Sequence, residues 1–145
     1  MDIREIRIGD IVTTNGKPMG TKEGDYYQVI EIDSKNKLDD FVGSVTIESV
    51  SDKSFGQVCV WVDYLEPIPL TDKLLERLGF EPIFNGNYHK HIDNFDLLLI
   101  DLVTSYEIVI EDYDLGRMMG NKSIKYLHQL QHELYDTGVE FKIEL

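Results

Sequence analysis

One C-terminal stretch decides the fold of the second half of this chain: Ile124-Lys-Tyr-Leu-His-Gln-Leu-Gln-His-Glu-Leu-Tyr-Asp-Thr-Gly138-Val-Glu-Phe141. At about 100° per residue its apolar side chains fall in one stripe and its charged side chains lie opposite, which predicts an amphipathic helix that packs one face on a core. The stripe consists of Ile124, Leu127, Leu130 and Leu134. We expect Asn121 or Ser123 to cap the first free amides of this helix, and Gly138 to end it in a left-handed conformation.

The spacing of apolar residues changes to two after Gly138. The apolar positions are Val139, Phe141, Ile143 and Leu145, and charged residues stand between them. Such alternation is typical of a strand with one buried and one wet face. The chain is therefore expected to end inside a sheet.

The first 67 residues contain short apolar segments separated by turn-forming residues, which predicts a small β-barrel. These segments are 10–14, 26–32, 45–48 and 57–62. The last of them is apolar at every position from Val58 to Val62, so we expect both of its faces to be covered. Cys59 lies inside it and is expected to be buried and unreactive.

Two prolines, Pro67 and Pro69, mark the predicted domain boundary, because proline has no backbone N–H to donate to a neighbouring strand and so does not fit a central strand of a sheet. The sequence thus predicts an α+β protein with a barrel in residues 1–67 and a small α+β domain in residues 68–145.

The predicted second domain opens with a short helix that Thr71 caps and Gly79 ends. The dipeptide Asn85-Gly86 is typical of a hairpin turn between two strands. The strands that we expect are 80–84, 88–92, 97–102 and 106–111. We expect residues 116–121 to form a loop that leads to the final helix.

The chain is acidic throughout, with 14 Lys and Arg against 27 Asp and Glu, and a formal net charge of −13 at pH 7. Seven basic and thirteen acidic residues leave a charge of −6 in residues 1–67, and seven against fourteen leave −7 in residues 68–145. Binding to a phosphate backbone draws mainly on Lys and Arg, so the charge argues against nucleic acid or an anionic membrane as a direct partner.

The lone cysteine, Cys59, excludes an internal disulfide framework. The first residues show neither the apolar run nor the cleavage site of a signal peptide. The apolar runs, of which residues 97–100 are one, are all far shorter than a membrane span. These features predict a cytoplasmic location.

Four histidines form two pairs whose spacing permits metal ligation. His89 and His91 are two apart on a predicted strand, and His128 and His132 are four apart on the predicted helix. Metalloprotease helices carry a glutamate after the first histidine, which is missing here, and no carboxylate is evident in register with either pair. We therefore predict no metal and no cofactor, and we expect His128 to be partly buried with a hydrogen-bond partner.

Catalytic and calcium-binding motifs are incomplete or missing. The run Asp112-Tyr-Asp114-Leu-Gly116 starts like a calcium loop, but it lacks the third ligand and has Ser123 at the twelfth position. Nucleophile elbow, phosphate loop and dinucleotide fingerprint are all absent from the sequence. The sequence predicts a protein that is not an enzyme.

Two glutamines of the C-terminal helix have different expected roles. Gln131 falls within the apolar stripe, where an amide without a partner would cost about 1–3 kcal/mol, so we expect it to bond to backbone or a tyrosine. Gln129 lies on the polar face. With His128 and His132 it forms the set of candidate interaction residues.

Three segments resemble a family of uncharacterised small proteins of gut Bacteroidetes bacteria and their phages and mobile elements. They are Ile6-Arg-Ile-Gly-Asp-Ile-Val12, Leu65-Glu-Pro-Ile-Pro-Leu-Thr-Asp-Lys-Leu-Leu-Glu-Arg-Leu-Gly-Phe80 and Lys125-Tyr-Leu-His-Gln-Leu-Gln131. The last is similar to the family motif Tyr-Val-His-Gln-Leu-Gln, with Leu127 in place of valine. Where the family often continues with Asn-Leu-Tyr, this chain has His132-Glu-Leu-Tyr135. The resemblance implies a biological context but no activity.

The first of these segments also resembles the opening strand of SH3-like barrels, in which Gly-Asp precedes apolar residues. Many such barrels bind RNA, peptides or other proteins. The sequence as a whole favours a non-catalytic module that binds another protein of a phage or mobile element. There are two alternatives. One is an acidic antagonist of a nucleic-acid-binding protein, whose carboxylates mimic the phosphates of nucleic acid, and the other is a metal-dependent enzyme that uses the histidines.

We predict no measurable affinity for duplex DNA or RNA at physiological salt, because neither half of the chain has the excess of basic residues that releases counterions from phosphates. Fluorescence polarisation with labelled duplexes checks this. Submicromolar binding that weakens as salt is raised would contradict it.

Overall fold

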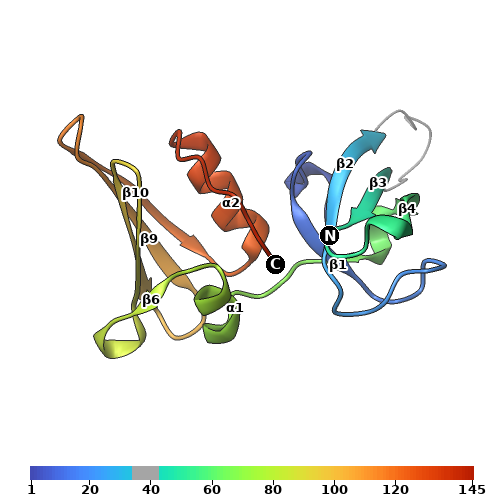
Figure 1. Cartoon of the computed structure of the whole chain (residues 1–145), viewed down its shortest axis with the longest axis horizontal. Helices are drawn as coiled ribbons and strands as arrows, with labels where there is room; N and C mark the ends of the chain where they lie inside the picture. Colours follow the sequence, from blue (N-terminus) through green and yellow to red (C-terminus); the bar gives the residue numbers. More distant parts are fainter. Residues whose placement is uncertain (34–42) are drawn as a thin grey trace. The chain divides into compact units, whose positions relative to one another are not determined.

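Two blocks of antiparallel strands make up the chain in the computed structural model, which describes residues 1–33 and 43–145 (Figure 1). They belong to two compact units, Met1–Ile68 and Pro69–Leu145. This division lies one residue beyond the boundary that the prolines indicate. The predicted α+β class is confirmed.

Unit 1 is a five-stranded antiparallel sheet in the order β4-β3-β2-β1-β5. Its elements are η1 (Ile3–Glu5), β1 (Ile11–Thr14), β2 (Tyr27–Asp33), β3 (Ser44–Ser49), η2 (Lys53–Phe55), β4 (Gln57–Trp61), η3 (Val62–Tyr64) and β5 (Leu65–Glu66). The four predicted strand segments correspond to β1, β2, β3 and β4. The sheet is not a closed barrel, because β4 and β5 are its end strands and no pairing joins them in the described residues.

The apolar core of unit 1 follows from the alternation of side chains along these strands. Cross-strand neighbours Val29 and Ile47, and Val45 and Val60, all point into it. Its buried members are Ile6, Val12, Tyr27, Val29, Val45, Ile47, Val60, Val62 and Leu65.

Strand β4 differs from what the sequence predicts. Val60 is buried, but Cys59 is exposed and Trp61 is 45% exposed. Val58 and Val60 on one face of β4 pack on the core, whereas Cys59 and Trp61 alternate with them and point to the other face, which the described residues of unit 1 leave exposed. The expectations that both faces are covered and that Cys59 is buried are therefore wrong.

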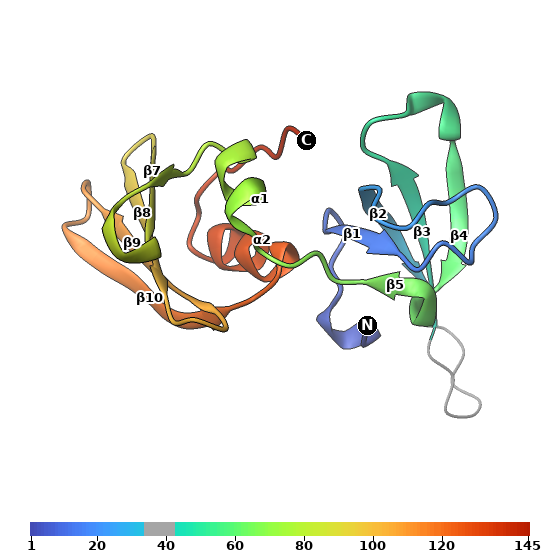
Figure 2. The same ribbon diagram turned by 90° about the horizontal axis from the view of Figure 1, so that it is seen from below.

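Unit 2 is a second five-stranded antiparallel sheet, in the order β10-β9-β8-β7-β6. Its elements are α1 (Asp72–Arg77), β6 (Glu81–Pro82), η4 (Phe84–Gly86), β7 (Tyr88–Ile92), β8 (Phe95–Asp101), β9 (Tyr106–Asp112), β10 (Arg117–Ile124) and α2 (Leu127–Asp136). Both α-helices lie on the same side of this sheet (Figures 1 and 2).

Helix α1 forms as its sequence predicts. The Thr71 hydroxyl accepts a hydrogen bond from the Leu74 amide at 3.2 Å, which satisfies one of the free amides of the first turn. Gly79 takes the left-handed conformation, with φ 83°, just beyond the helix. Phe80 then folds back, is buried, and donates its amide to the Leu75 carbonyl at 3.0 Å.

Strand β10 was not predicted, and helix α2 begins later than expected. Ile124 is the last residue of β10, and Asn121 and Ser123 also lie in that strand, so neither caps the helix. The chain reverses earlier, where the Asp112 carboxylate accepts the amides of Asp114 and Leu115. A register shift in β10 between residues 120 and 122 interrupts the alternation that would have marked a strand. The predicted loop at 116–121 is therefore wrong.

The C-terminal segment 139–145 is not a strand. Gly138 ends α2 with φ 79°, and Val139 is buried and donates its amide to the Leu134 carbonyl at 2.8 Å. The Phe141 ring then meets the Phe80 ring edge-on at 6.3 Å. The alternating residues thus give the segment an apolar side that packs, but no neighbouring strand pairs with its backbone in the described residues. The expectation that the chain ends inside a sheet is wrong.

Truncation of the buried leucines of α2 tests its packing. Leu127→Ala and Leu130→Ala should each lower the free energy of unfolding by about 2–5 kcal/mol, because both side chains are fully buried and each change leaves a cavity. Tyr135→Ala on the same helix should cost under about 0.5 kcal/mol, since Tyr135 is 80% exposed. Urea unfolding measures all three. Unchanged midpoints for both leucine variants would show that α2 does not pack on a core.

Candidate functional site

The most distinctive surface of unit 2 is the sheet face that points away from α1 and α2, which we call the outer face (Figure 2). Side chains alternate along β8 and β9, so residues between the buried positions Leu97, Leu99, Ile108 and Ile110 point outward. Alternation, register and the hydrogen bond of Tyr113 assign to the outer face Glu81, His89, His91, Asp96, Leu98, Ile100, Glu107, Val109, Glu111, Tyr113, Met118 and Ser123.

Strand register arranges these residues in rows across the sheet. One row runs from His89 to Leu98 to Val109, each opposite the next. The neighbouring row pairs His91 with Asp96, Asp96 with Glu111, and Glu111 with Met118. Opposite residues on adjacent strands are close enough for their side chains to interact, so each row acts as a unit.

Asp96 is the centre of a hydrogen-bonded cluster on the outer face. Its Oδ1 lies 2.7 Å from His91 Nδ1 and 3.2 Å from His89 Nε2. The Tyr113 hydroxyl donates to the other carboxylate oxygen. We call these four residues the Asp96 cluster.

The Asp96 cluster changes the acidity of its members. The hydrogen bond from Tyr113, followed by those to His91 and His89, holds the pKa of Asp96 below its usual value. The same hydrogen bond raises the pKa of Tyr113 to about 12, because loss of its proton would put two anions side by side. The cluster therefore keeps a negative charge and a neutral phenol on the outer face at neutral pH.

The arrangement corrects the expectation that no carboxylate stands in register with His89 and His91. His89 Nε2 and His91 Nδ1 both contact Asp96 Oδ1 directly. This is a hydrogen-bonding geometry, whereas metal ligands would surround a shared position for the ion. Among the described residues no group of three or more His, Cys, Asp or Glu is placed to hold a metal ion. The prediction that the protein binds no metal remains a prediction.

Apolar side chains occupy the middle of the outer face. Leu98, Ile100 and Val109 are half-buried by their neighbours although no helix of unit 2 covers them. Tyr113 and Met118 are 53% and 69% exposed. These adjacent apolar residues, bordered by the exposed Tyr113 and Met118, make the outer face the candidate binding surface of unit 2.

Gln129, one of the candidate interaction residues on α2, also has a structural role at the start of the helix. The Gln129 side-chain oxygen accepts the amides of Lys125 at 2.8 Å and Tyr126 at 3.2 Å, which caps the start of the helix. The sequence placed Gln129 on the polar face among the candidate interaction residues, and this capping role was not predicted. Removing such a cap costs about 0.5–2 kcal/mol.

His128 is buried, with its ring stacked on Tyr126 at 5.9 Å and edge-on to His132 at 5.6 Å. Burial, with the nearby His132, lowers its pKa to about 4. Its Nδ1 has no hydrogen-bond partner in the described part of the chain. Gln131, expected in the apolar stripe, is only half-buried. The structure does not bring these residues to the Asp96 cluster.

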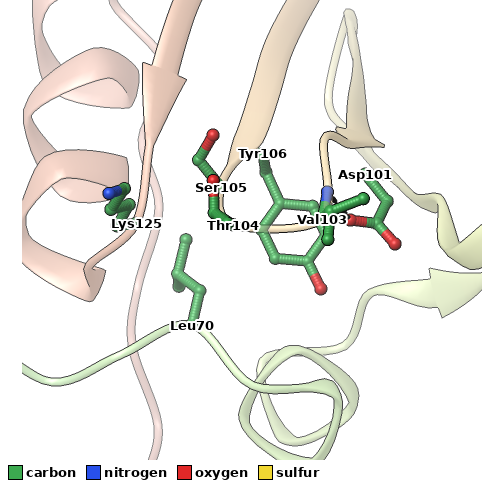
Figure 3. Close-up of a pocket in the computed structure, with 7 residues that line it drawn as sticks. All are labelled: Leu70, Asp101, Val103, Thr104, Ser105, Tyr106 and Lys125. Carbon is green, nitrogen blue, oxygen red and sulfur yellow. Dashed lines mark hydrogen bonds between the residues drawn. The ribbon is translucent and has the colours of Figure 1, made fainter.

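A small pocket of about 120 Å³ lies elsewhere in unit 2, at the turn between β8 and β9 (Figure 3). It is lined by Leu70, Asp101, Val103, Thr104, Ser105, Tyr106 and Lys125. Ligand sites usually exceed about 300 Å³, so this pocket is too small for most metabolites.

Comparison with protein-family models, with curated proteins and with solved structures gave no match for this chain. The described residues contain no helix with the length and apolar character that a membrane crossing requires. The resemblance of the three segments therefore stays a prediction.

Sequence reasoning missed Asp96, although one signal could have found it. Asp93-Asn94 forms the turn between β7 and β8, and Asp93 has a positive φ of 50°. A two-residue turn at these positions pairs residue 92 with 95 and residue 91 with 96. That register places Asp96 opposite His91 from sequence alone.

Val103 in the pocket wall has a strained backbone that offers a test. Its φ is 76° and its side chain is 92% exposed, although a β-branched residue is rarely left-handed. Val103→Gly should raise the free energy of unfolding by about 0.5–1 kcal/mol. The substitution relieves roughly 1–2 kcal/mol of backbone strain in the folded state, which exceeds the stability that is lost because glycine gives the unfolded chain more conformational entropy. Thr104→Gly, where φ is not positive, should lower it. Urea unfolding measures both variants. Equal decreases in the free energy of unfolding would show that the backbone at Val103 is not strained.

Proposed function

We propose that this protein is a non-catalytic interaction module that binds another protein through the outer face. One observation carries the proposal: Leu98, Ile100 and Val109 form an apolar centre on a sheet face that no element of unit 2 covers. Covering such residues removes apolar surface from water, which is the main driving force of association.

The surroundings of this apolar centre support the same proposal. Tyr and Met are enriched in protein interfaces, and Tyr113 and Met118 stand at its border. The hydrogen bond to Asp96 holds the Tyr113 ring in place, so little side-chain freedom is lost on binding. The backbone beneath them is a regular ladder, which needs no rearrangement to receive a partner.

The two alternative functions fit the outer face less well. A mimic of nucleic acid needs a continuous track of carboxylates. Here Val109 separates Glu107 from Glu111 along β9, and the outward residues that follow Asp96 along β8 are the apolar Leu98 and Ile100. A metal-dependent enzyme needs open ligands, whereas His89 and His91 are both engaged by Asp96.

We also propose that unit 1 is an SH3-like barrel. The strand order β4-β3-β2-β1-β5 and the 3-10 turn η3 directly before β5 support this assignment, as does the Gly9-Asp10 dipeptide before β1. The resemblance of the three sequence segments suggests that the partner is a protein of a phage or mobile element. Fold alone does not identify that partner.

The proposal is tested by capture with the full chain from cells that express its neighbouring genes. We expect the wild type to retain one protein, and the double variant Leu98→Thr, Val109→Thr to lose it, since threonine keeps strand preference but removes apolar contact. Ile8→Thr is the matched control, because Ile8 is 68% exposed in unit 1. Capture that is equal for all three chains, or no capture by the wild type, would contradict the proposal.

A further inference from the structure

The charges of the outer face go beyond a general binding role and indicate the chemistry of the partner. Four carboxylates belong to this face: Glu81, Asp96, Glu107 and Glu111. Among its described residues there is no Lys or Arg. No Lys or Arg among the described residues of this face therefore offsets the four carboxylates around the apolar centre.

The basic residues of the same strands point to the opposite side. Lys90 stands between His89 and His91 in β7, yet its Nζ lies 5.9 Å from the centre of the Phe141 ring on the helix side. Lys122 in β10 forms an ion pair with Glu133 of α2 at 2.9 Å. The alternation of the strands thus separates positive charge from negative charge across the sheet.

The spacing along β9 narrows the choice of partner further. Its outward residues are Glu107, Val109 and Glu111, so an apolar side chain lies between two carboxylates at intervals of two residues. In a strand this interval is about 6.8 Å. An extended segment with a basic, an apolar and a basic residue at alternate positions has the same spacing and the opposite charge.

We propose that the outer face binds an extended basic segment of a partner protein, with an apolar side chain between two Lys or Arg residues. This inference rests on the proposed function. The apolar side chain covers Val109 and Leu98, and the basic side chains meet Glu107 and Glu111. Exposed ion pairs contribute little affinity, so the carboxylates act mainly by selecting a basic partner and by speeding its encounter.

The test is an NMR titration of the full chain with three synthetic peptides. The first is Thr-Lys-Thr-Leu-Thr-Lys-Thr, the second has Glu in place of Lys, and the third has the composition of the first but with both Lys adjacent. We expect the first peptide to shift the amide signals of β8 and β9. The second should shift none, and the third should bind at least threefold more weakly than the first.

Two charge variants complete the test. Glu107→Gln with Glu111→Gln should weaken binding of the first peptide at least fivefold. Glu76→Gln with Glu140→Gln removes the same charge from exposed residues outside this face and should change binding less than twofold. Spectra of the free variants confirm that each is folded.

The outcomes separate this inference from the function on which it rests. Equal weakening by both double variants, or no shifts with the first peptide, would overturn the basic partner. If a captured protein still depends on Leu98 and Val109 but not on Glu107 and Glu111, the interaction module stands and the basic segment does not. If capture does not depend on Leu98 and Val109, the proposed function fails as well.

Discussion

The structure of unit 2 depends on one constraint: a five-stranded sheet has two faces, and the unit has helices for only one of them (Figure 2). The strands bury Leu97, Leu99, Ile108 and Ile110 on the inner side, and α2 adds Leu127, Leu130 and Leu134. Each of these leucines contributes roughly 1.5–3 kcal/mol by leaving water. Since side chains alternate along a strand, the neighbours of each residue that points into the core point to the opposite side of the sheet, and these residues form the outer face.

Polar residues and a glycine fix the two ends of α2 and hold the helix against the inner face of the sheet. Gln129 holds the first turn by accepting two backbone amides, and Gly138 lets the chain turn back so that Val139 closes the other end. Glu133 is almost buried and pairs with Lys122 of β10, which ties the helix to the sheet. Within the motif that resembles a family hallmark, Gln129 caps the helix, and Leu127 and Leu130 are buried in its packing face.

Local signals allowed much of the fold to be predicted. The strands β1 to β4 and β7 to β9, and the helix between Thr71 and Gly79, follow from alternation, caps and turn residues that lie within a few positions of one another. The errors have a different origin. Whether residues 139–145 pair with a strand, whether Ile124 belongs to a strand or a helix, and which face of β4 is covered depend on neighbours that are distant in sequence.

The candidate site was harder to predict for the same reason. His89 and His91 were recognised as a pair, but Asp96 becomes their partner only through the register of β7 and β8. Gln129 was placed on the correct face of its helix, yet its role depends on how the chain enters the first turn from β10. Residue spacing identifies which side chains share a face, and tertiary contacts decide what that face does.

An apolar centre on an uncovered sheet face carries a hazard, because two copies of the chain could bury it against each other. The carboxylates of the outer face oppose this outcome, since two such faces would bring like charges together without a Lys or Arg among their described residues to offset them. The net charge of −13 acts in the same direction at longer range. A partner with basic residues meets no such penalty. Acidic residues around Leu98 and Val109 can therefore both prevent self-association and select the partner, which explains why an apolar surface and a strong negative charge occur on the same face.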